Sequence, residues 1–296
     1  MQNKWPYAGH VKFTDVTMSY RTTLDPSVYK LSFVIEPGMK VGIVGRTGAG
    51  KSSILQVLFR LNDLSEGSIQ IDEIDIRDMG LHMLRKSIAY IPQSPFLIQG
   101  TIRENLDPAR RFTDDELWEY LDDVRLKDHI KKFEGELMTE ITESNNLFSI
   151  GQKQLICLCR AMLVKTKLVV LDEATANVDL QTDNFISTMI REQFLEKHKA
   201  TVILIAHRLA TVIDADRILV MGDGERLEYD HPFRLLTKTD DDKTITSNSN
   251  FAQMIKASGE ETATQLFNTC LQKFKTRPNS AKRKAKDRLK KMLISV

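Results

Sequence analysis

The chain has 296 residues, and its 42 basic and 40 acidic residues give a formal net charge of +2. Apolar residues make up 42% of the chain, which is enough for a full hydrophobic core and excludes disordered, collagen-like and coiled-coil proteins. The longest apolar runs are far shorter than the ~18 residues that a membrane span needs, and the first residues lack the apolar core of a secretory signal. We therefore expect a soluble, cytosol-facing chain of one large domain or two small ones.

The basic residues are concentrated near the C-terminal end. Between Lys273 and Lys291 there are ten basic residues and one acid, Asp287, and subtracting these from the totals leaves 32 basic and 39 acidic residues. This asymmetry predicts that the basic tail is a separate module, which we assign to 259–296 after a main domain at 1–258. From Ala281 to Val296 the apolar residues have helical spacing, so the tail could contact an anionic membrane surface or a regulatory partner. A solvated end is the alternative, and a nucleic-acid partner is not expected because interleaved aromatic residues are lacking.

The strand patterns change character along the chain. Residues 11–16 and 31–35 alternate between apolar and polar, which predicts half-buried strands of an antiparallel layer. Three later segments, 40–44, 168–171 and 201–206, are continuously apolar, as is typical of buried parallel strands. Helical patterns occupy the intervals, at 52–61, 152–164 and 181–194. Together these patterns predict an α/β fold with a parallel sheet covered on both faces and an antiparallel layer at the N-terminal end.

The middle of the chain is expected to be an inserted helical subdomain, at about 81–163, because it has few β-branched runs and many short helical patterns. Thr113 and Glu116 have the spacing of a capping box ahead of Trp118, a residue that we expect to pack on its helix. Farther along, alternating segments on both sides of Gly222 and Gly224 predict a hairpin. The polar residues 237–250 predict a loop.

A glycine-rich loop follows the first buried strand and opens a helix, which is the structural setting of a phosphate-binding loop. Its glycines let backbone N–H groups point at phosphates, and the helix directs its positive end toward them. Lys51 would bring a charge to the β- and γ-phosphates, and the Ser52 hydroxyl would bind Mg²⁺. The predicted ATP-binding residues of this loop are Gly45, Arg46, Thr47, Gly48, Ala49, Gly50, Lys51, Ser52 and Ser53.

A second nucleotide motif lies at the end of the buried strand 168–171. Asp172 would hold Mg²⁺ through water, and Glu173 would polarise the water that attacks the γ-phosphate. Since an Asp-Glu pair after a strand can also simply begin a loop, the prediction depends on the phosphate loop that precedes it.

The remaining motifs resemble those of ATP-binding-cassette (ABC) ATPases. Phe148-Ser149-Ile150-Gly151-Gln152 is similar to the signature sequence of that family, with Phe148 and Ile150 in place of the usual leucine and glycine. Gln93 resembles the Q-loop glutamine, 176–179 the D-loop and His207 the switch histidine. Tyr20 stands where the family has an aromatic residue that stacks on adenine.

The resemblance implies a composite site, in which two nucleotide-binding domains pack head to tail around ATP. It assigns catalytic roles to Lys51, Gln93, Glu173 and His207, and metal contacts to Ser52, Gln93 and Asp172. Ser149, Gly151 and Gln152 would contact the ATP of the partner domain. Alone, Ser149 could be an ordinary helix cap, His207 a structural histidine, Gln93 a loop residue and Tyr20 a core aromatic. Cys157 and Cys159 are expected to pack rather than to bind a metal or perform redox chemistry.

Other segments resemble subfamily C, the multidrug-resistance-associated proteins, and specifically their second nucleotide-binding domain. These segments are Trp5-Pro6, 41–53 and 100–108, and the resemblance covers about 5–258. It implies an ATPase that powers export through transmembrane domains, on the cytoplasmic face of a membrane, as a fragment or an isolated domain. The alternatives are a regulatory cassette with little hydrolysis and a soluble ABC ATPase outside transport.

Overall fold

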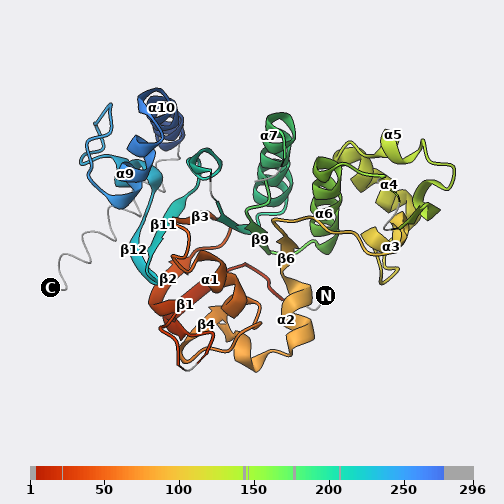
Figure 1. Ribbon diagram of the computed structural model, residues 1–296, viewed down its shortest axis with the longest axis horizontal. Helices are drawn as coiled ribbons and strands as arrows, with labels where there is room; N and C mark the ends of the chain where they lie inside the picture. Colours follow the sequence, from red (N-terminus) through yellow and green to blue (C-terminus); the bar gives the residue numbers. More distant parts are fainter. Residues whose placement is uncertain are drawn as a thin grey trace.

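The computed structural model describes residues 5–21, 23–142, 145, 147–175, 178–206 and 208–276. Its strands form two main sheets, and helices cover the larger sheet (Figure 1). Within these ranges no helix is both long enough and apolar enough to cross a lipid bilayer. The two sheets, with helices covering the larger one, confirm the α/β fold predicted from the sequence.

The first sheet is antiparallel and has the strand order β2-β1-β4-β5. In β1, Val11 and Phe13 are buried while Lys12 is exposed, which is the two-residue period of a strand with one buried face. Phe13 stacks on Phe33 of β2, with 4.5 Å between the ring centroids. The sequence patterns predicted the first two strands and missed the others. The strands are β1 (Val11–Met18), β2 (Val28–Ile35), β4 (Glu66–Ile71) and β5 (Ile74–Asp75).

The second sheet has the strand order β12-β11-β3-β10-β9-β6, and all its neighbours are parallel except the β11–β12 hairpin. The carboxyl ends of its parallel strands therefore meet at one edge, where ligands bind in sheets of this type. The three predicted parallel strands and the predicted hairpin are confirmed. The strands are β3 (Lys40–Gly45), β6 (Ala89–Ile91), β9 (Leu168–Asp172), β10 (Thr201–Ile205), β11 (Arg217–Gly222) and β12 (Glu225–Asp230).

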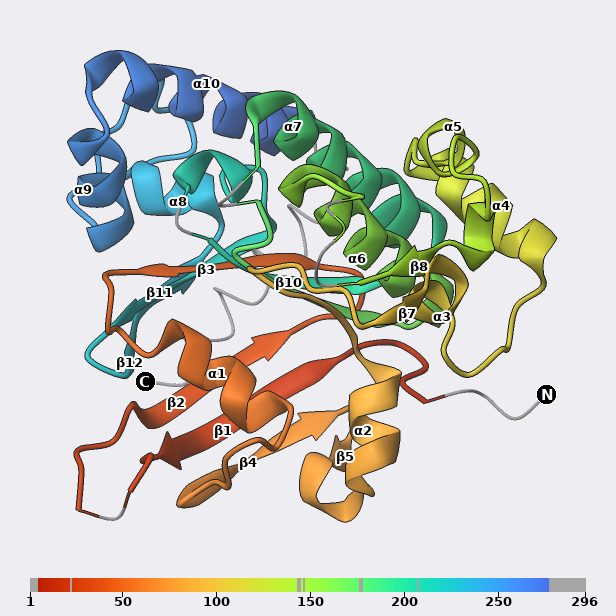
Figure 2. The same ribbon diagram turned by 45° about the vertical axis from the view of Figure 1, so that its right-hand side comes forward.

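Side chains of the central strands point alternately to the two faces of the sheet, and each face is covered by a hydrophobic core. On one face Val170 and Ile203 share a hydrophobic core with helix α1 (Lys51–Leu58) and the antiparallel sheet. On the other face Leu171 and Leu204 belong to a second core. Figure 2 shows α1 between the two sheets and the longer helices on the opposite side of the central sheet.

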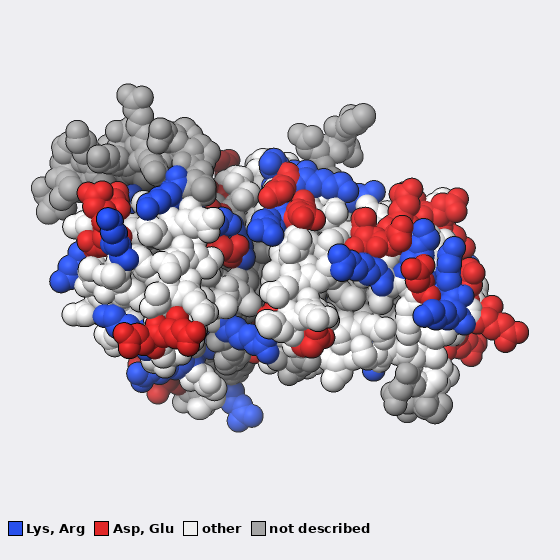
Figure 3. Space-filling model, turned by 90° about the horizontal axis from the view of Figure 1, so that it is seen from above, with Lys and Arg blue, Asp and Glu red and all other residues white. Residues whose placement is uncertain are grey.

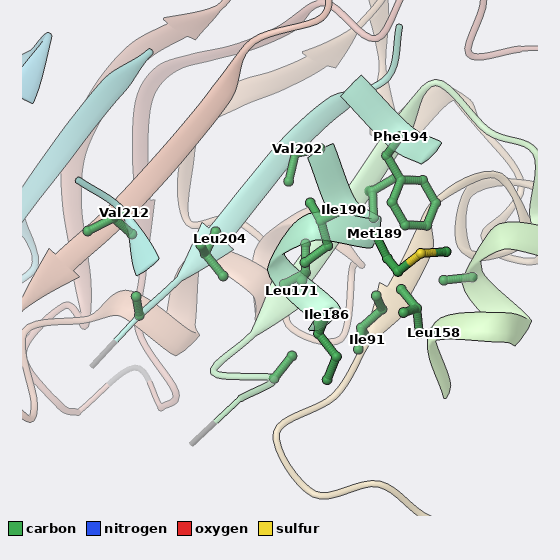
Figure 4. Packing of buried hydrophobic residues seen from close by; sticks show 14 of the residues in the cluster. Ile91, Leu158, Leu171, Ile186, Met189, Ile190, Phe194, Val202, Leu204 and Val212 are labelled. Carbon is green, nitrogen blue, oxygen red and sulfur yellow. The ribbon is translucent and has the colours of Figure 1, made fainter. Parts of the chain in front are cut away.

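Helices α6 (Ile150–Val164) and α7 (Leu180–Met189) cover that opposite face. Helix α7 continues as a π-helix, η3 (Ile190–Lys197). Ile186 and Met189 of α7 and Phe194 of η3 are buried. Figure 4 shows them gathered against Leu171 of β9 and Leu158 of α6. This apolar stripe fixes α7 on the sheet.

A helical subdomain extends from the central sheet at the side of β6 (Figure 1). Thr101, Thr113 and Ser149 each form a capping box at the start of a helix, which confirms the box predicted at Thr113. The predicted range 81–163 also takes in β6, which belongs to the central sheet and is too short for its periodicity to be recognised. The remaining elements here are α3 (Ile102–Leu106), α4 (Asp114–Asp123), α5 (Lys127–Ile130), β7 (Gly100–Thr101), β8 (Glu140–Ile141) and the 3₁₀ helix η2 (Glu136–Met138). Helix α2 (Leu81–Ser87) and the 3₁₀ helix η1 (Ile76–Asp78) instead belong with the antiparallel sheet, because Leu84 and Ile76 are buried in its core.

The C-terminal helices correct the predicted boundary at 258/259. Helix α10 (Glu260–Thr276) packs on α8 (Pro232–Leu236) and α9 (Asn250–Ala257) and belongs to the same hydrophobic core as the central sheet. Phe274 stacks on Phe233 of α8 with 4.4 Å between ring centroids. The folded body thus continues through α10, because the apolar residues of this helix recur at helical spacing and face α8. The remainder of the predicted tail, 277–296, lies outside the described residues.

Replacing Phe267 by alanine should lower the free energy of unfolding by about 3 kcal/mol, because it leaves a cavity in the core beneath α10. Phe267 is buried, with its ring centroid 6.0 Å from that of Phe233. Urea denaturation followed by circular dichroism measures the change, and Gln265→Ala, exposed on the same helix, is the control. Equal midpoints for the two variants would show that α10 contributes nothing to the stability of the body.

Candidate nucleotide-binding and catalytic site

The loop between β3 and α1 requires glycine at its last turn. Gly50 precedes α1 with φ +91°, a conformation that L side chains rarely adopt. A Cβ atom at this position would lie 2.3 Å from the carbonyl oxygen of Ser27. The loop can therefore pass close to the neighbouring chain segment, and the helix that follows directs its free N–H groups into the loop.

The ammonium group of Lys51 lies across this loop. Its Nζ donates to the carbonyl oxygens of Gly45 and Arg46, both at 3.0 Å, and the residue is 6% exposed. The positive charge is thus held where the loop would surround a phosphate group. Ser52, the next residue of α1, is exposed.

The end of β9 brings two carboxylates to the same edge of the sheet. Asp172 lies opposite Ile205 of β10, and β10 lies next to β3, which leads into the phosphate loop. Glu173 turns away from the strand with φ +48°, while its N–H donates to the carbonyl oxygen of Ile205 at 3.0 Å. Glu173 is 8% exposed, so its carboxylate is almost fully removed from bulk water.

Gln93 and Tyr90 reach these two carboxylates from β6 and the loop after it. The Gln93 Nε2 donates to Glu173 Oε2 at 2.6 Å, and the Tyr90 hydroxyl donates to Asp172 Oδ2 at 3.2 Å. The structure thus brings Gln93 and Glu173, which are 80 residues apart in the chain, into direct contact. The sequence reasoning missed Tyr90, although its place on the strand before Gln93 could have pointed to it.

Burial affects the pKa of two groups in this cluster, Asp172 and Tyr90. It raises the pKa of Asp172, the charge of Glu173 adds to this rise, and the hydrogen bond from Tyr90 opposes it. Burial, together with the charge of Asp172, raises the pKa of Tyr90 to about 12, which keeps the phenol protonated as a hydrogen-bond donor.

The predicted adenine-stacking residue, Tyr20, lies outside the core, and its ring is accessible from solvent. It follows β1, is 48% exposed, and its hydroxyl lies 3.0 Å from the Ser53 Oγ of α1. The alternative of a core aromatic is therefore wrong. The hydrogen bond places the ring beside the phosphate loop, with an exposed face that a base could contact.

The signature residues form the exposed start of α6. Ser149 accepts from the Gln152 N–H, and the Gln152 side chain accepts from the Ser149 N–H at 2.9 Å. Ile150 is 56% exposed beside them, whereas Phe148 is buried against the rings of Phe133 and His129. Phe148 thus anchors the segment, while the helix end faces outward.

The structure does not unite the signature with the phosphate loop. In the part of the chain that the structure describes, no hydrogen bond joins Ser149, Gly151 or Gln152 to the loop or to Glu173. The signature instead lies close to the start of α7, because a Cβ added to Gly151 would lie 3.5 Å from the Thr182 side chain. His207, Ala176 and Asn177, the remaining parts of the predicted switch and D-loop, lie outside the described residues.

The cysteines take part in packing, as predicted. Cys157 and Cys159 are buried and form no disulfide, and burial raises the pKa of both thiols, that of Cys159 to about 12. Both groups are therefore kept as unreactive thiols.

The side chains at the loop and at the end of β9 suit a magnesium ion. Mg²⁺ prefers hard oxygen ligands and keeps several waters. Ser52 offers a hydroxyl and Asp172 offers a carboxylate. Burial disfavours the charged form of Asp172, and a bound cation would stabilise that form. Gln93 donates to Glu173 through its nitrogen, so its amide oxygen is the atom that could face a cation or its water.

The comparison with protein families agrees with this geometry. The sequence model of the family described as ABC transporter matches residues 28–176, the range from β2 through the phosphate loop to Glu173. The chain belongs to the ABC transporter family. It is similar to proteins named as members of ATP-binding cassette sub-family C.

Relatives and solved structures extend the similarity beyond the matched range. The chain is 46% identical over 272 residues to ATP-binding cassette sub-family C member 4 of Mus musculus, covering 91% of this chain and 20% of that protein. It is 45% identical over 235 residues to Metal resistance protein YCF1 of Saccharomyces cerevisiae, covering 79% of this chain and 15% of that protein. A bacterial Atm1-family ABC exporter with ATP bound has a TM-score of 0.75 and 30% identity, over 86% of this chain and 43% of the other. The chain thus spans only about a fifth or less of the length of these curated relatives.

Proposed function

We propose that the chain hydrolyses magnesium-bound ATP and thereby powers export by an ABC transporter. The observation that carries the proposal is the buried Glu173 carboxylate, oriented by Gln93 at 2.6 Å, at the sheet edge where the loop holds Lys51. Phosphoryl transfer depends on positioning and on electrostatic stabilisation, and these groups supply both.

In the proposed reaction the loop N–H groups and Lys51 bind the β- and γ-phosphates, and the exposed ring of Tyr20 stacks on adenine. Glu173 accepts a proton from the water that attacks the γ-phosphorus. The new P–O bond forms in line as the bond to the β-phosphate oxygen breaks, which yields ADP and phosphate. Bound Mg²⁺, held by Ser52, Asp172 and Gln93, would neutralise charge on the phosphate oxygens. His207 is proposed to contact the γ-phosphate.

A second nucleotide-binding domain is needed to complete this site. The Ser149 end of α6 is exposed and its N-terminal N–H groups attract anions, which supports a role toward the γ-phosphate held by a partner domain. We therefore propose a head-to-tail dimer in which Ser149, Gly151 and Gln152 serve the partner's ATP. Ile150, 56% exposed at the same helix end, would limit how closely that end approaches the phosphate.

The transmembrane domains of the exporter are the other proposed partners. Phe96 and Ile98, in the segment after Gln93, are 62% and 48% exposed. Arg160 of α6 holds this segment by donating to the Phe96 carbonyl oxygen at 3.0 Å. Exposed apolar side chains on a braced segment favour a protein contact. Phe96 also lines a pocket of about 310 Å³ between this segment and β8. A site there would connect the transmembrane domains with Gln93.

The proposed location is supported by the similarity to a bacterial Atm1-family ABC exporter. The chain would be membrane-associated through its transmembrane partners, on the cytoplasmic face, where ATP is available. We further propose that the basic residues after 276 contact anionic lipid. Binding of that segment to anionic vesicles tests this part of the proposal.

The experiment that tests the function measures phosphate release against protein concentration. If two domains complete the site, the rate per molecule should rise with the concentration of the chain, alone or mixed with the first nucleotide-binding domain of a subfamily C relative. Ser149→Glu should abolish this rise through repulsion of the γ-phosphate, with binding of a fluorescent ATP analogue retained. Thr264→Glu, exposed on α10, is the control. A rate that is the same at every concentration, and unaffected by Ser149→Glu, would contradict the composite site.

A further inference from the structure

An ion pair joins the start of α7 to the loop after β10. Arg208 Nη1 donates to Asp183 Oδ2 at 3.2 Å, and the Asp183 side chain is only 10% exposed while that of Arg208 is 46% exposed. Figure 4 shows Ile186 and Ile190 in the buried cluster against the sheet. Asp183 precedes them by three and seven residues, so helical spacing assigns it to the same face of α7. A carboxylate thus occupies a position where the helix pattern calls for an apolar side chain.

Stability alone does not account for this carboxylate. Burying a charge costs free energy, and a single pairing often returns no more than that cost. Moreover, Asp183 Oδ1 is buried without a hydrogen-bond partner in the part of the chain that the structure describes. An apolar residue at this position would extend the apolar stripe of α7, so packing does not explain why a charged residue is found there.

The packing around α7 supplies such a reason. Asp183 and Asn184 line an open cleft of about 700 Å³ between α7 and α10, and Figure 3 shows the surface hollowed between these helices. Among the residues that the structure describes, no helix therefore packs against the first turns of α7 on that side. Leu180, the first residue of the helix, is 70% exposed, so the ion pair braces an end that hydrophobic contacts leave loose.

Both partners of the pair lie next to the proposed machinery. The Asp183 N–H donates to the carbonyl oxygen of Asp179, the residue that caps α7 and ends the predicted D-loop. Arg208 directly follows the predicted switch position, 207, and shares a small cavity of about 20 Å³ with Glu173. The pair thus connects the segment that would face the partner domain with the surroundings of the catalytic carboxylate.

We propose that Asp183 and Arg208 are positioning residues of the ATPase. Together they hold the start of α7, which Asp179 caps, and the loop after β10 in one arrangement relative to Glu173. The inference rests on the proposed function. It predicts that breaking the pair impairs hydrolysis more than nucleotide binding, because neither residue belongs to the phosphate loop.

The test compares Asp183→Asn and Arg208→Gln with the unmodified chain in two measurements. Since small displacements of catalytic groups cost about 10²-fold, we expect kcat for phosphate release to fall by about 10–100-fold. The Kd of a fluorescent ATP analogue should stay within about twofold. Hydrogen exchange should accelerate by about 10-fold in residues 178–184 and 208–211 together, since each segment loses its brace.

Conservative and control variants separate positioning from general damage. Arg208→Lys keeps a donor and a charge for the contact with Asp183 at 3.2 Å, so it should restore most of kcat. Asp230→Asn breaks a pair of similar length, Arg217 Nη1 to Asp230 Oδ1 at 2.8 Å, in the β11–β12 hairpin. It should leave kcat and exchange near the active site unchanged.

Several outcomes would overturn the inference. These are an unchanged kcat in Asp183→Asn, equal losses of binding and hydrolysis, or faster exchange throughout the chain. Faster hydrogen exchange in α7 alone, with the exchange of residues 208–211 unchanged, would also refute the link between the two segments. Failure of the unmodified chain to bind the analogue would instead refute the proposed function, while the exchange measurement would still report on the link.

Discussion

Glu173→Gln should bind ATP as tightly as the unmodified chain and hydrolyse it about 10²–10⁴-fold more slowly, the usual scale for loss of a positioned base. The substitution removes the charge that accepts the proton of the attacking water but keeps the shape of the side chain. The oxygen of the new amide can still accept from Gln93 Nε2, so the contact at 2.6 Å and the turn at φ +48° should persist. Binding and hydrolysis are therefore expected to separate.

Phosphate release under saturating magnesium-bound ATP, with a fluorescent ATP analogue for the Kd, measures the two effects. Glu66→Gln makes the same chemical change at an exposed position of the antiparallel sheet and should leave both quantities unchanged. Turnover at the unmodified rate in Glu173→Gln would rule out this carboxylate as the general base. Loss of analogue binding would show that Glu173 supports the nucleotide site as a whole.

Lys51→Ala should weaken ATP binding by about 10–100-fold, because hydrogen bonds from a charged donor contribute about 1.5–3 kcal/mol each. The lysine is 6% exposed and its Nζ is already held inside the loop by two carbonyl oxygens at 3.0 Å. On binding, phosphate oxygens would take the place of these neutral partners. The loss should therefore be largest for ATP and smaller for ADP, which lacks the γ-phosphate.

Titration with the analogue in its triphosphate and diphosphate forms measures this difference. Lys12→Ala, which removes an exposed lysine from β1, is the matched control and should change neither affinity. Equal weakening of both forms would indicate a collapsed loop, which Gly50→Ala is expected to cause because its Cβ would lie 2.3 Å from the Ser27 oxygen. Unchanged affinity in Lys51→Ala would contradict the proposed phosphate site.

Parts of the fold could be predicted because they depend on local patterns. The parallel strands at β3, β9 and β10 are continuously apolar, and the start of α4 has the Thr113–Glu116 capping spacing. Strand β6 could not be found in this way, because a three-residue segment has no measurable period. The boundary at 258 was misplaced because it followed the extent of the family resemblance, whereas the apolar spacing of α10 packs Phe267 and Phe274 into the body.

For the site, the sequence by itself determined the chemistry of each motif: a glycine-rich loop ending at Lys51, an acidic pair after β9 and a capped helix start at Ser149. These depend on residues adjacent in the chain, where backbone geometry follows from residue type. Only the tertiary structure could show that Gln93 contacts Glu173, that Tyr90 contacts Asp172 and that Asp183 pairs with Arg208. Those contacts depend on which strands lie side by side and on which face of α7 meets the sheet, and the order of strands in a sheet is not encoded in any local pattern.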